Sequence, residues 1–400
     1  MKDTVVVSWA RGHSSLNVIR SLGRHKINIV AIDSLPGAPG FYSKYSTRTV
    51  LHPDPRSNFM AYVEFLKETC KKEECLSIIP MDEVTMYALS RYRDDFPQNM
   101  QIVWPEHEKM QVMQDRERLF NLAEKLDMPI PQTFVYDPSA ADRNPQLFPL
   151  VVKSRNSIEV KDNRIVDVPT TYILNDDDLQ KSAGALGAEC GTYPLVQEYI
   201  PGEGYAFFAF YNHGKLKATF QHHRLREANY KGCASSYRES VNIPQLEQEG
   251  RKLGDELKWH GPMMVEFKRD RRDGKFKLME VNPRFWGSMN LAIRAGVDFP
   301  YLFYQMAKYG DCDKISNYKV GVKGKNFNGE LAHLTSIIGD GAPLPFISKP
   351  NFVKSLFSVI ACGAITRDDY FSIDDPYPFI KALVNEGKHY SRMLFVRLKK

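Results

Sequence analysis

The first hundred residues alternate between short apolar runs and stretches with helical periodicity. Apolar runs at residues 5–8 and 27–33 flank a segment in which apolar side chains recur every third position. This order of strand, helix and strand is typical of a parallel α/β unit. A further apolar run at residues 76–80 leads into another helical segment. The pattern therefore predicts a small doubly wound α/β domain over residues 1–108.

The pattern changes in the middle of the chain. A helix is predicted over residues 115–126, because its apolar positions form one stripe, and two prolines follow it. Strands are then predicted at 148–153 and 195–200, the second broken by Pro201-Gly202-Glu203-Gly204, and a hairpin follows at residues 205–222. Consecutive strands replace the alternation of strand and helix. We therefore expect an α+β domain over residues 109–310.

The last part of the chain carries little chemical signal. An apolar run covers residues 352–364, and residues 380–384 are predicted to be helical. We treat residues 311–400 as a C-terminal accessory region whose role the sequence does not define.

A second hairpin carries the strongest candidate site. Apolar strands at residues 263–267 and 276–281 flank a polar turn, and Glu266 and Glu280 each lie seven residues from Asp273. The two carboxylates should therefore face each other, and such like-charged pairs are destabilising. Asn282 should project from the same face, because it lies two residues beyond Glu280. Two carboxylates and an amide oxygen around one point predict a Mg²⁺ site, with Mn²⁺ as the alternative ion.

The alternative for these glutamates is a solvated sheet face, since charged residues mostly lie at surfaces. Their strongly apolar strands, and the polar cluster with Arg284 that ends the second strand, favour the metal site.

Composition narrows the class of protein only moderately. The chain has 400 residues, 43% of them hydrophobic, with 54 Lys and Arg against 48 Asp and Glu. The net charge of +6 is mild and selects neither nucleic acid nor an anionic small molecule. The six cysteines lack CxxC spacing, and we see neither a signal peptide nor an apolar stretch long enough to span a membrane. A reducing cytoplasm is therefore the expected location.

Glu266 followed by Glu280-Val281-Asn282-Pro283-Arg284 resembles the metal-binding signature of the ATP-grasp superfamily. The resemblance implies an ATP-grasp fold preceded by a small α/β domain, with ATP and Mg²⁺ as cofactors. It also implies a nucleotide site, in which Lys153 contacts the α-phosphate and the adenine and a hinge holds the adenine edge. Residues 197–200 resemble the hinge, Glu203 occupies the usual position of a ribose-binding acid, and Arg116 matches a position that is commonly lysine. The hinge residues are Gln197, Glu198, Tyr199 and Ile200.

Two segments narrow the resemblance within the superfamily. Residues 280–288 and 223–227 resemble a group of predicted carboxylate–amine ligases, with D-aspartate ligase and the carbamoyl phosphate synthetase large chain as more distant likenesses. The resemblance implies an enzyme that activates a carboxylate as an acyl phosphate and joins it to an amine, forming ADP.

Three arginines are the candidate catalytic residues. Arg284 points toward the metal face and can stabilise charge during phosphoryl transfer. Arg224 and Arg226 should share one face of a strand, so that one binds substrate while the other pairs with Glu227. The alternative for Arg284 is a surface salt bridge.

The phosphate-covering loop departs from the superfamily pattern. Ser154-Arg155-Asn156-Ser157 follows Lys153, and the next glycine is Gly184. Glycine lets backbone amides approach phosphate closely. This loop must therefore rely on Ser154, Ser157 and the Arg155 guanidinium, and we expect residues 154–168 to close over the site.

Two rival functions stay open. One is another ATP-grasp chemistry, such as carboxylation or carbamate phosphorylation, and the other is an ATP-binding regulator without catalysis.

Asp82 and Glu83 could recognise an ammonium group, or Asp82 could cap a helix. The expected partners are a small carboxylate and an amine, without nucleic acid or membrane, and a homo-oligomer is possible. The sequence identifies neither substrate.

Overall fold

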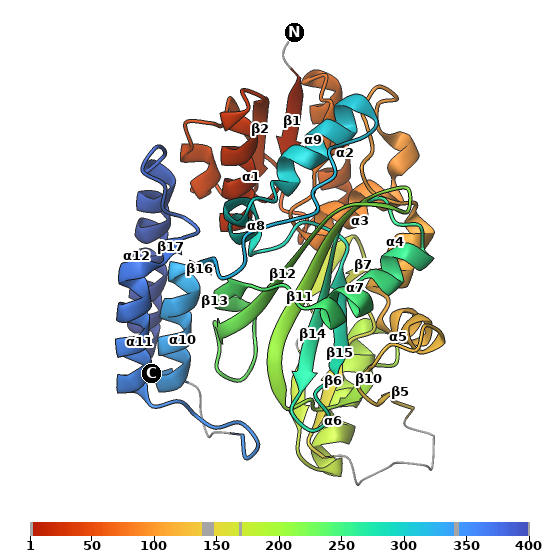
Figure 1. The fold of residues 1–400 in the computed structure, drawn as a ribbon, viewed down its shortest axis with the longest axis vertical. Helices are drawn as coiled ribbons and strands as arrows, with labels where there is room; N and C mark the ends of the chain where they lie inside the picture. The colour runs from red at the N-terminus through yellow and green to blue at the C-terminus, as the bar shows by residue number, and fades with distance from the viewer. Residues whose placement is uncertain (1–2, 138–147, 168–169, 340–343, 399–400) are drawn as a thin grey trace.

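A four-stranded parallel sheet forms the first part of the computed structural model, which describes residues 3–137, 148–167, 170–339 and 344–398. Its strands are parallel, as the alternating pattern predicts, and lie in the order β3-β2-β1-β4 (Figure 1). Its elements are β1 (Thr4–Val7), α1 (His13–Arg24), β2 (Asn28–Asp33), β3 (Arg48–Leu51), α2 (Phe59–Lys72), β4 (Ser77–Ile79) and α3 (Glu83–Arg91). Helices α4 (His107–Gln114) and α5 (Arg116–Lys125) follow, and Asp115 caps α5 by accepting backbone N–H bonds.

A small antiparallel sheet comes next, in the order β5-β10-β6-β9. Its elements are β5 (Thr133–Val135), β6 (Leu150–Lys153), β9 (Thr171–Ile173) and β10 (Leu195–Glu198), with α6 (Asp176–Cys190) packed beside them. Between β6 and β9 a separate hairpin forms from β7 (Ile158–Lys161) and β8 (Arg164–Asp167). This hairpin forms most of the loop expected over residues 154–168, of which residue 168 lies outside the described residues.

The large sheet has seven strands in the order β15-β14-β11-β12-β13-β16-β17. They are β11 (Gly202–Asn212), β12 (Lys215–Glu227), β13 (Ser235–Ser240), β14 (Gly261–Asp270), β15 (Phe276–Asn282), β16 (Lys323–Lys325) and β17 (Arg367–Asp368). Both hairpins predicted from the sequence are present, although β11 begins at Gly202, where the sequence suggested a break. The accessory region therefore supplies the last two strands of this sheet.

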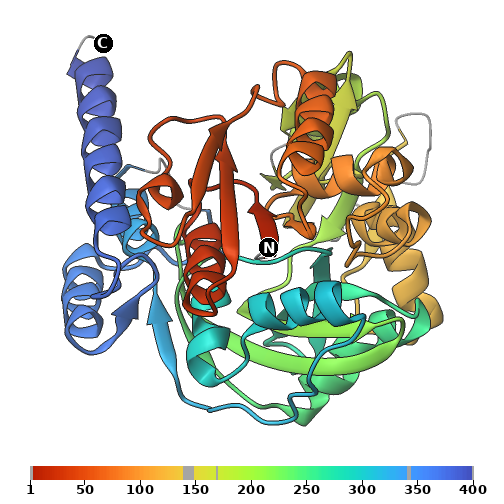
Figure 2. The ribbon, with the colours of Figure 1, turned by 90° about the horizontal axis from the view of Figure 1, so that it is seen from above.

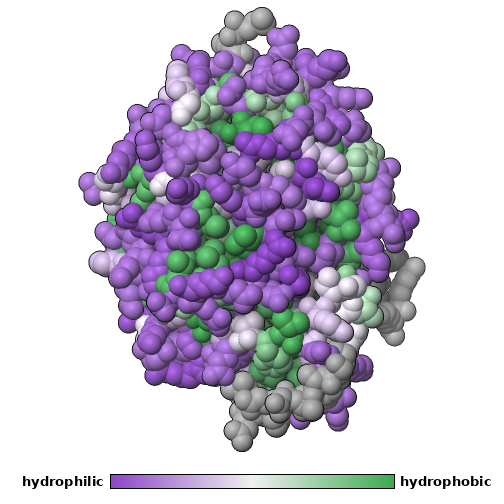
Figure 3. Space-filling model, turned by 90° about the vertical axis from the view of Figure 1, so that its right-hand side faces the viewer, coloured by the Kyte–Doolittle hydropathy of each residue, from purple (hydrophilic) through white to green (hydrophobic). Residues whose placement is uncertain are grey.

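The remaining helices are α7 (Pro244–Glu256), α8 (Met289–Ala295), α9 (Phe299–Tyr309), α10 (Phe327–Gly339), α11 (Phe352–Ile365) and α12 (Tyr377–Leu398). Figures 1 and 2 both place the C-terminal helices, in blue, on one side of the large sheet and the small sheet on the other. The face in Figure 3 is mostly hydrophilic, with small separate apolar patches. Among the described residues, no helix is long and apolar enough to cross a membrane.

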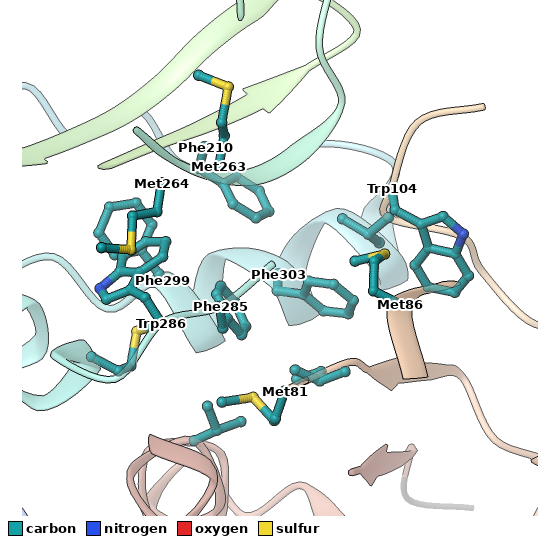
Figure 4. Packing of buried hydrophobic residues seen from close by; sticks show 14 of the residues in the cluster. Met81, Met86, Trp104, Phe210, Met263, Met264, Phe285, Trp286, Phe299 and Phe303 are labelled. Atoms are coloured by element: carbon teal, nitrogen blue, oxygen red, sulfur yellow. The ribbon is translucent and has the colours of Figure 1, made fainter. Parts of the chain in front are cut away.

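One hydrophobic core joins the parallel sheet to the large sheet. Met81 and Met86, at the carboxyl end of β4 and in α3, lie in the same cluster as Phe285 and Trp286, which follow β15 (Figure 4). Trp286 packs its ring 4.3 Å from Phe208 of β11. Because the two sheets share this core, the packing does not separate them into domains. The domain boundaries predicted at residues 108 and 310 therefore stay predictions.

A buried ion pair attaches the accessory region to the first helix. Arg20 of α1 is 2% exposed, and its Nε donates to Asp375 at 2.9 Å. Its two NH groups donate to the backbone oxygens of Tyr370 and Asp375, both at 2.7 Å. Asp375 in turn accepts from the hydroxyl of Ser43 at 2.7 Å. These bonds fix the segment between β17 and α12 against α1.

Candidate active site

A cavity of about 970 Å³ lies where the small sheet, the large sheet, the start of α1 and the C-terminal helices meet. This volume is at the upper end of the usual range for ligand sites, so it has room for a nucleotide and further substrates. Ten of the predicted site residues line it: Lys153, Gln197, Glu198, Tyr199, Ile200, Arg224, Glu266, Glu280, Asn282 and Arg284.

The predicted acidic pair faces the cavity from two neighbouring strands. Glu266 of β14 lies directly opposite Glu280 of β15, and Asn282 lies opposite Met264. The amide nitrogen of Asn282 is 3.4 Å from Glu266 Oε1 and 3.3 Å from Glu280 Oε1. The hairpin thus brings together the three groups that the sequence predicted would converge.

The register that creates this pairing depends on a β-bulge. Near the turn Phe267 pairs with Leu278, a register that would put Met279 opposite Glu266 if it continued. The pairing shifts between Glu266 and Phe267, so Met279 is the extra residue and Glu280 becomes the partner of Glu266. The spacing argument around Asp273 gave the right pair, but it could not reveal the bulge.

Cationic side chains surround the two carboxylates. Arg224 forms an ion pair with Glu266, and Arg116 lies 3.6 Å from Glu280. Burial raises the pKa of Glu266 above its usual value, although Arg224 opposes the shift. The pKa of Glu280 is lowered despite its burial, because Arg116 and Lys153 favour its charged form. At neutral pH this arrangement keeps Glu280 ionised.

The donor set fits a divalent ion that also binds phosphate oxygens. Among the described residues, no three His, Cys, Asp or Glu side chains form a metal site that the protein alone could complete. A site of two carboxylates and an amide has fewer protein ligands. It leaves ligand positions to phosphate and water, as is usual for Mg²⁺. Asn282 Oδ1 accepts from Arg284 at 3.1 Å, so its amide must turn over to present oxygen to a metal.

The predicted hinge offers one unpaired acceptor to the cavity. Gln197 is 1% exposed, and its Nε2 donates to Thr133 at 3.0 Å, whereas its Oε1 has no hydrogen-bond partner among the described residues. The Glu198 carboxylate is instead held by Arg272 at 3.0 Å and Lys277 at 3.2 Å. Gln197 can therefore bond an adenine amino group, while Glu198 anchors the hinge.

Lys153 ends β6 and points to the same region. Burial, and to a lesser extent the charge of Arg116, lowers the pKa of Lys153 to about 8. Arg116 donates to the backbone oxygen of Ser154 at 2.9 Å and to its hydroxyl at 3.3 Å. Neither Arg116 nor Ser154 lines the cavity directly. Both lie behind Lys153 and Glu280 and fix their surroundings.

The loop after Lys153 differs from the expectation. The Arg155 guanidinium pairs with Asp115 at 2.8 Å and Glu117 at 2.7 Å, so it is directed to the start of α5. At the tip of the β7–β8 hairpin, the backbone and side-chain oxygens of Asn163 accept from Phe59 N at 3.0 Å and Met60 N at 2.7 Å. The hairpin is therefore docked on the start of α2.

Two predicted residues are not brought to the cavity. Glu203 pairs with His223 at 3.1 Å on the face of β11 opposite to Glu266. Arg226 forms an ion pair with Glu330 of α10 and does not line the cavity, so it does not share the cavity face with Arg224, which pairs with Glu266 and Glu227. The pairing of β12 with β13 shifts on both sides of Arg226, and strict alternation from Arg224 therefore fails.

Several cavity residues were missed by the sequence analysis. Lys268 lies two residues after Glu266 on β14, and its Nζ is 3.3 Å from Ile200 O. Because side chains two residues apart on a strand project from the same face, this spacing could have identified Lys268 as a site residue. At Gly204 a Cβ would lie 2.6 Å from Arg224 Cδ, so glycine leaves room for the arginine to cross β11.

Residues of the accessory region also border the cavity. The ring centroid of Phe346 lies 4.6 Å from that of the hinge residue Tyr199, which lines the cavity. Asn328, Tyr370 and Glu386 line the cavity themselves. In the first sheet Asp82 caps α3, which is the structural alternative considered above, and Glu83 pairs with Arg284.

The architecture is that of an ATP-grasp fold, and solved structures agree over most of the chain. The biotin carboxylase domain of Hydrogenobacter thermophilus 2-oxoglutarate carboxylase, in complex with MgADP, ADP and bicarbonate, is 15% identical. It aligns over 81% of this chain and 73% of its own, with a TM-score of 0.64. An L-amino acid ligase from Bacillus licheniformis is 15% identical over 77% and 74% of the two chains, with a TM-score of 0.58.

N5-carboxyaminoimidazole ribonucleotide synthetase from Thermus thermophilus is 14% identical over 80% and 81% of the chains, with a TM-score of 0.56. Residues 192–328 match the model of a family described as ATP-grasp in the biosynthetic pathway with Ter operon. No curated protein sequence matches the chain. The resemblance to ATP-grasp proteins seen in the sequence, and the fold class that it implied, are thereby confirmed.

Proposed function

We propose that the protein is an ATP- and Mg²⁺-dependent ligase that joins a carboxylate to an amine and forms ADP. The observation that carries this proposal is that Glu266, Glu280 and Asn282 converge at one point, with several cationic side chains beside them. The same cavity contains the hinge with its unpaired Gln197 oxygen. The cytoplasmic location and the possible homo-oligomer belong to the same proposal.

The reaction would proceed in two steps. A substrate carboxylate oxygen attacks the γ-phosphorus of ATP, the bond between that phosphorus and the bridging oxygen breaks, and ADP leaves. Lys153 and Arg284 would balance the charge of the transferring group. The substrate ammonium group would first lose a proton to solvent. The neutral amine nitrogen would then attack the acyl carbon, phosphate would leave, and the nitrogen would lose a second proton. Glu266, Glu280 and Asn282 would hold a Mg²⁺ ion, which would supply electrostatic stabilisation of the phosphoryl group.

A screen of acid and amine pairs tests the proposal. Phosphate and ADP release are measured with amino acids and small carboxylates, each with and without an amine. We expect release only with particular pairs. Release that needs bicarbonate, without an organic acid, would indicate carboxylation or carbamate chemistry instead. Nucleotide binding without turnover for every pair would favour the regulator.

Nucleotide affinity should fall as the pH rises above 8. Polyphosphate binds the charged form of Lys153, which is the major form below its pKa of about 8. Each further pH unit should weaken Mg·ATP binding about tenfold, because binding must then include uptake of a proton. Calorimetry from pH 7 to 9.5 measures both the affinity and the proton uptake. Lys153→Arg keeps its charge and should flatten the profile; parallel profiles for the two proteins would contradict the assignment.

A further inference from the structure

Part of the cavity wall consists of polar residues outside the hinge and outside the hairpin of Glu266 and Glu280. We call it the distal pocket and define it by six lining residues: His13, His222, Trp286, Ser288, Asn328 and Glu386. They come from α1, β12, the segment after β15, α10 and α12. None belongs to the small sheet that holds the hinge. The region is therefore a separate part of the same cavity.

Three side chains in the distal pocket are buried and lack hydrogen-bond partners. His222 and Trp286 are 1% exposed and Ser288 is 5% exposed. Both ring nitrogens of His222, Trp286 Nε1 and Ser288 Oγ have no partner among the described residues. A buried polar group without a hydrogen-bond partner destabilises the fold. All three residues line the cavity, so a ligand seated there could supply the missing partners.

The bonds that these groups can make define part of the ligand. Trp286 can only donate, and the Ser288 hydroxyl can donate or accept. Burial and the nearby Arg224 and Arg238 lower the pKa of His222 well below its usual value, so its ring is neutral and offers one donor and one acceptor. The ligand should therefore carry at least one oxygen acceptor, such as a hydroxyl or carbonyl.

The charge of the pocket comes from Glu386. Its Oε1 accepts from Asn328 Nδ2 at 2.8 Å, and no described lysine or arginine lies within ion-pair distance of it. The other carboxylates of the cavity wall differ, because each has a cationic partner. The pairs are Glu198 with Arg272, Glu227 and Glu266 with Arg224, and Glu280 with Arg116. A half-buried carboxylate without a cation is a site for a cationic group.

We propose that the distal pocket binds the amine substrate, with Glu386 on its ammonium group and Trp286 and Ser288 on an oxygen of its body. The substrate class is a small polar primary amine with a hydroxyl or carbonyl oxygen close to the nitrogen. A carboxylate substrate is disfavoured here by the charge of Glu386, and it belongs with Arg224 and Arg284. This inference rests on the proposed ligase function. It also gives the accessory region a role, since Asn328 and Glu386 lie within it.

Binding of four probe amines to the full chain loaded with Mg·ADP tests the pocket. The probes are ethanolamine, L-serinamide, glucosamine and n-propylamine, titrated by calorimetry or saturation-transfer NMR. The polar amines should bind about tenfold more tightly than n-propylamine. Glu386→Gln keeps the bond from Asn328 but removes the charge, so it should weaken all four about 10- to 100-fold. Glu256→Gln, the same change at an exposed position of α7, should have no effect.

A second variant separates recognition from folding. Trp286→Phe keeps an aromatic ring beside Phe208 and Phe299, whose rings lie 4.3 Å and 4.9 Å from Trp286, and removes only the N–H donor. It should weaken the binding of ethanolamine and L-serinamide several-fold but leave the binding of n-propylamine unchanged. A purely structural role would change all probes alike.

Three results would overturn the inference. They are no binding of any polar amine at tens of millimolar, equal binding by wild type and Glu386→Gln, or loss of a Mn²⁺ site in Glu386→Gln with amine binding unchanged. A different result would overturn the proposed function alone. If the polar amines bind through Glu386 but no acid and amine pair releases ADP, the pocket stands and the ligase proposal falls.

Discussion

Glu280→Gln should reduce ADP release by roughly a thousandfold while the protein stays folded. Loss of one group that stabilises the transition state typically lowers kcat by about 10²–10³. Here the substitution also removes one of the two charges on which a divalent ion would depend. Glutamine has the size of glutamate, and the lost charge faces Arg116 and Lys153 in a part of the site that is already rich in cations.

The assay is steady-state ADP release with the most active acid and amine pair, alongside calorimetric titration of Mg·ATP. Glu256→Gln serves as the matched control, because it makes the same change at an exposed helix position. Wild-type turnover in Glu280→Gln would discredit the metal assignment, and with it the reaction that depends on it.

Arg20→Met should lower the free energy of unfolding by about 3–5 kcal/mol. The substitution leaves the Asp375 carboxylate, which is 1% exposed, without its cationic partner. Breaking a buried pair by removing one partner is strongly destabilising, because the remaining charge stays out of water. It also removes the bonds from Arg20 to the backbone oxygens of Tyr370 and Asp375.

The same helix supplies a control for this experiment. Arg24 pairs with Asp374 at 3.1 Å, but both side chains are substantially exposed, at 45% and 39%. Arg24→Met should therefore cost less than about 1 kcal/mol. Denaturant titration of both variants measures the difference. Equal destabilisation would show that burial of the Arg20 pair does not decide the stability of this contact.

The parts of the fold that could be predicted from sequence are those fixed by local patterns. Strand and helix periodicity identified the parallel sheet and both hairpins, and spacing along one hairpin found Glu266, Glu280 and Asn282. Such arguments work because the side-chain period of a strand is fixed. They fail where the period is interrupted, as at Arg226, where the register shifts on either side.

Contacts between segments that are far apart along the chain could not be predicted from local sequence patterns. Asn328 and Glu386 approach the cavity only because β16 and β17 join the edge of the large sheet, and no local pattern around them indicates a site. Glu203 looked well placed by its distance from the hinge. The strand carries it to the opposite face instead, where it pairs with His223.

The attachment of the last two strands at the far edge of the large sheet has a consequence for how such enzymes diversify. The proposed metal-binding groups lie on one continuous hairpin, whereas the proposed amine pocket draws Asn328 and Glu386 from a late segment of the chain. If both proposals hold, we expect changes in that segment to exchange one amine for another and to leave phosphoryl transfer unchanged. Chimaeras that replace residues 323–398 alone would show whether the choice of acceptor is inherited with that segment.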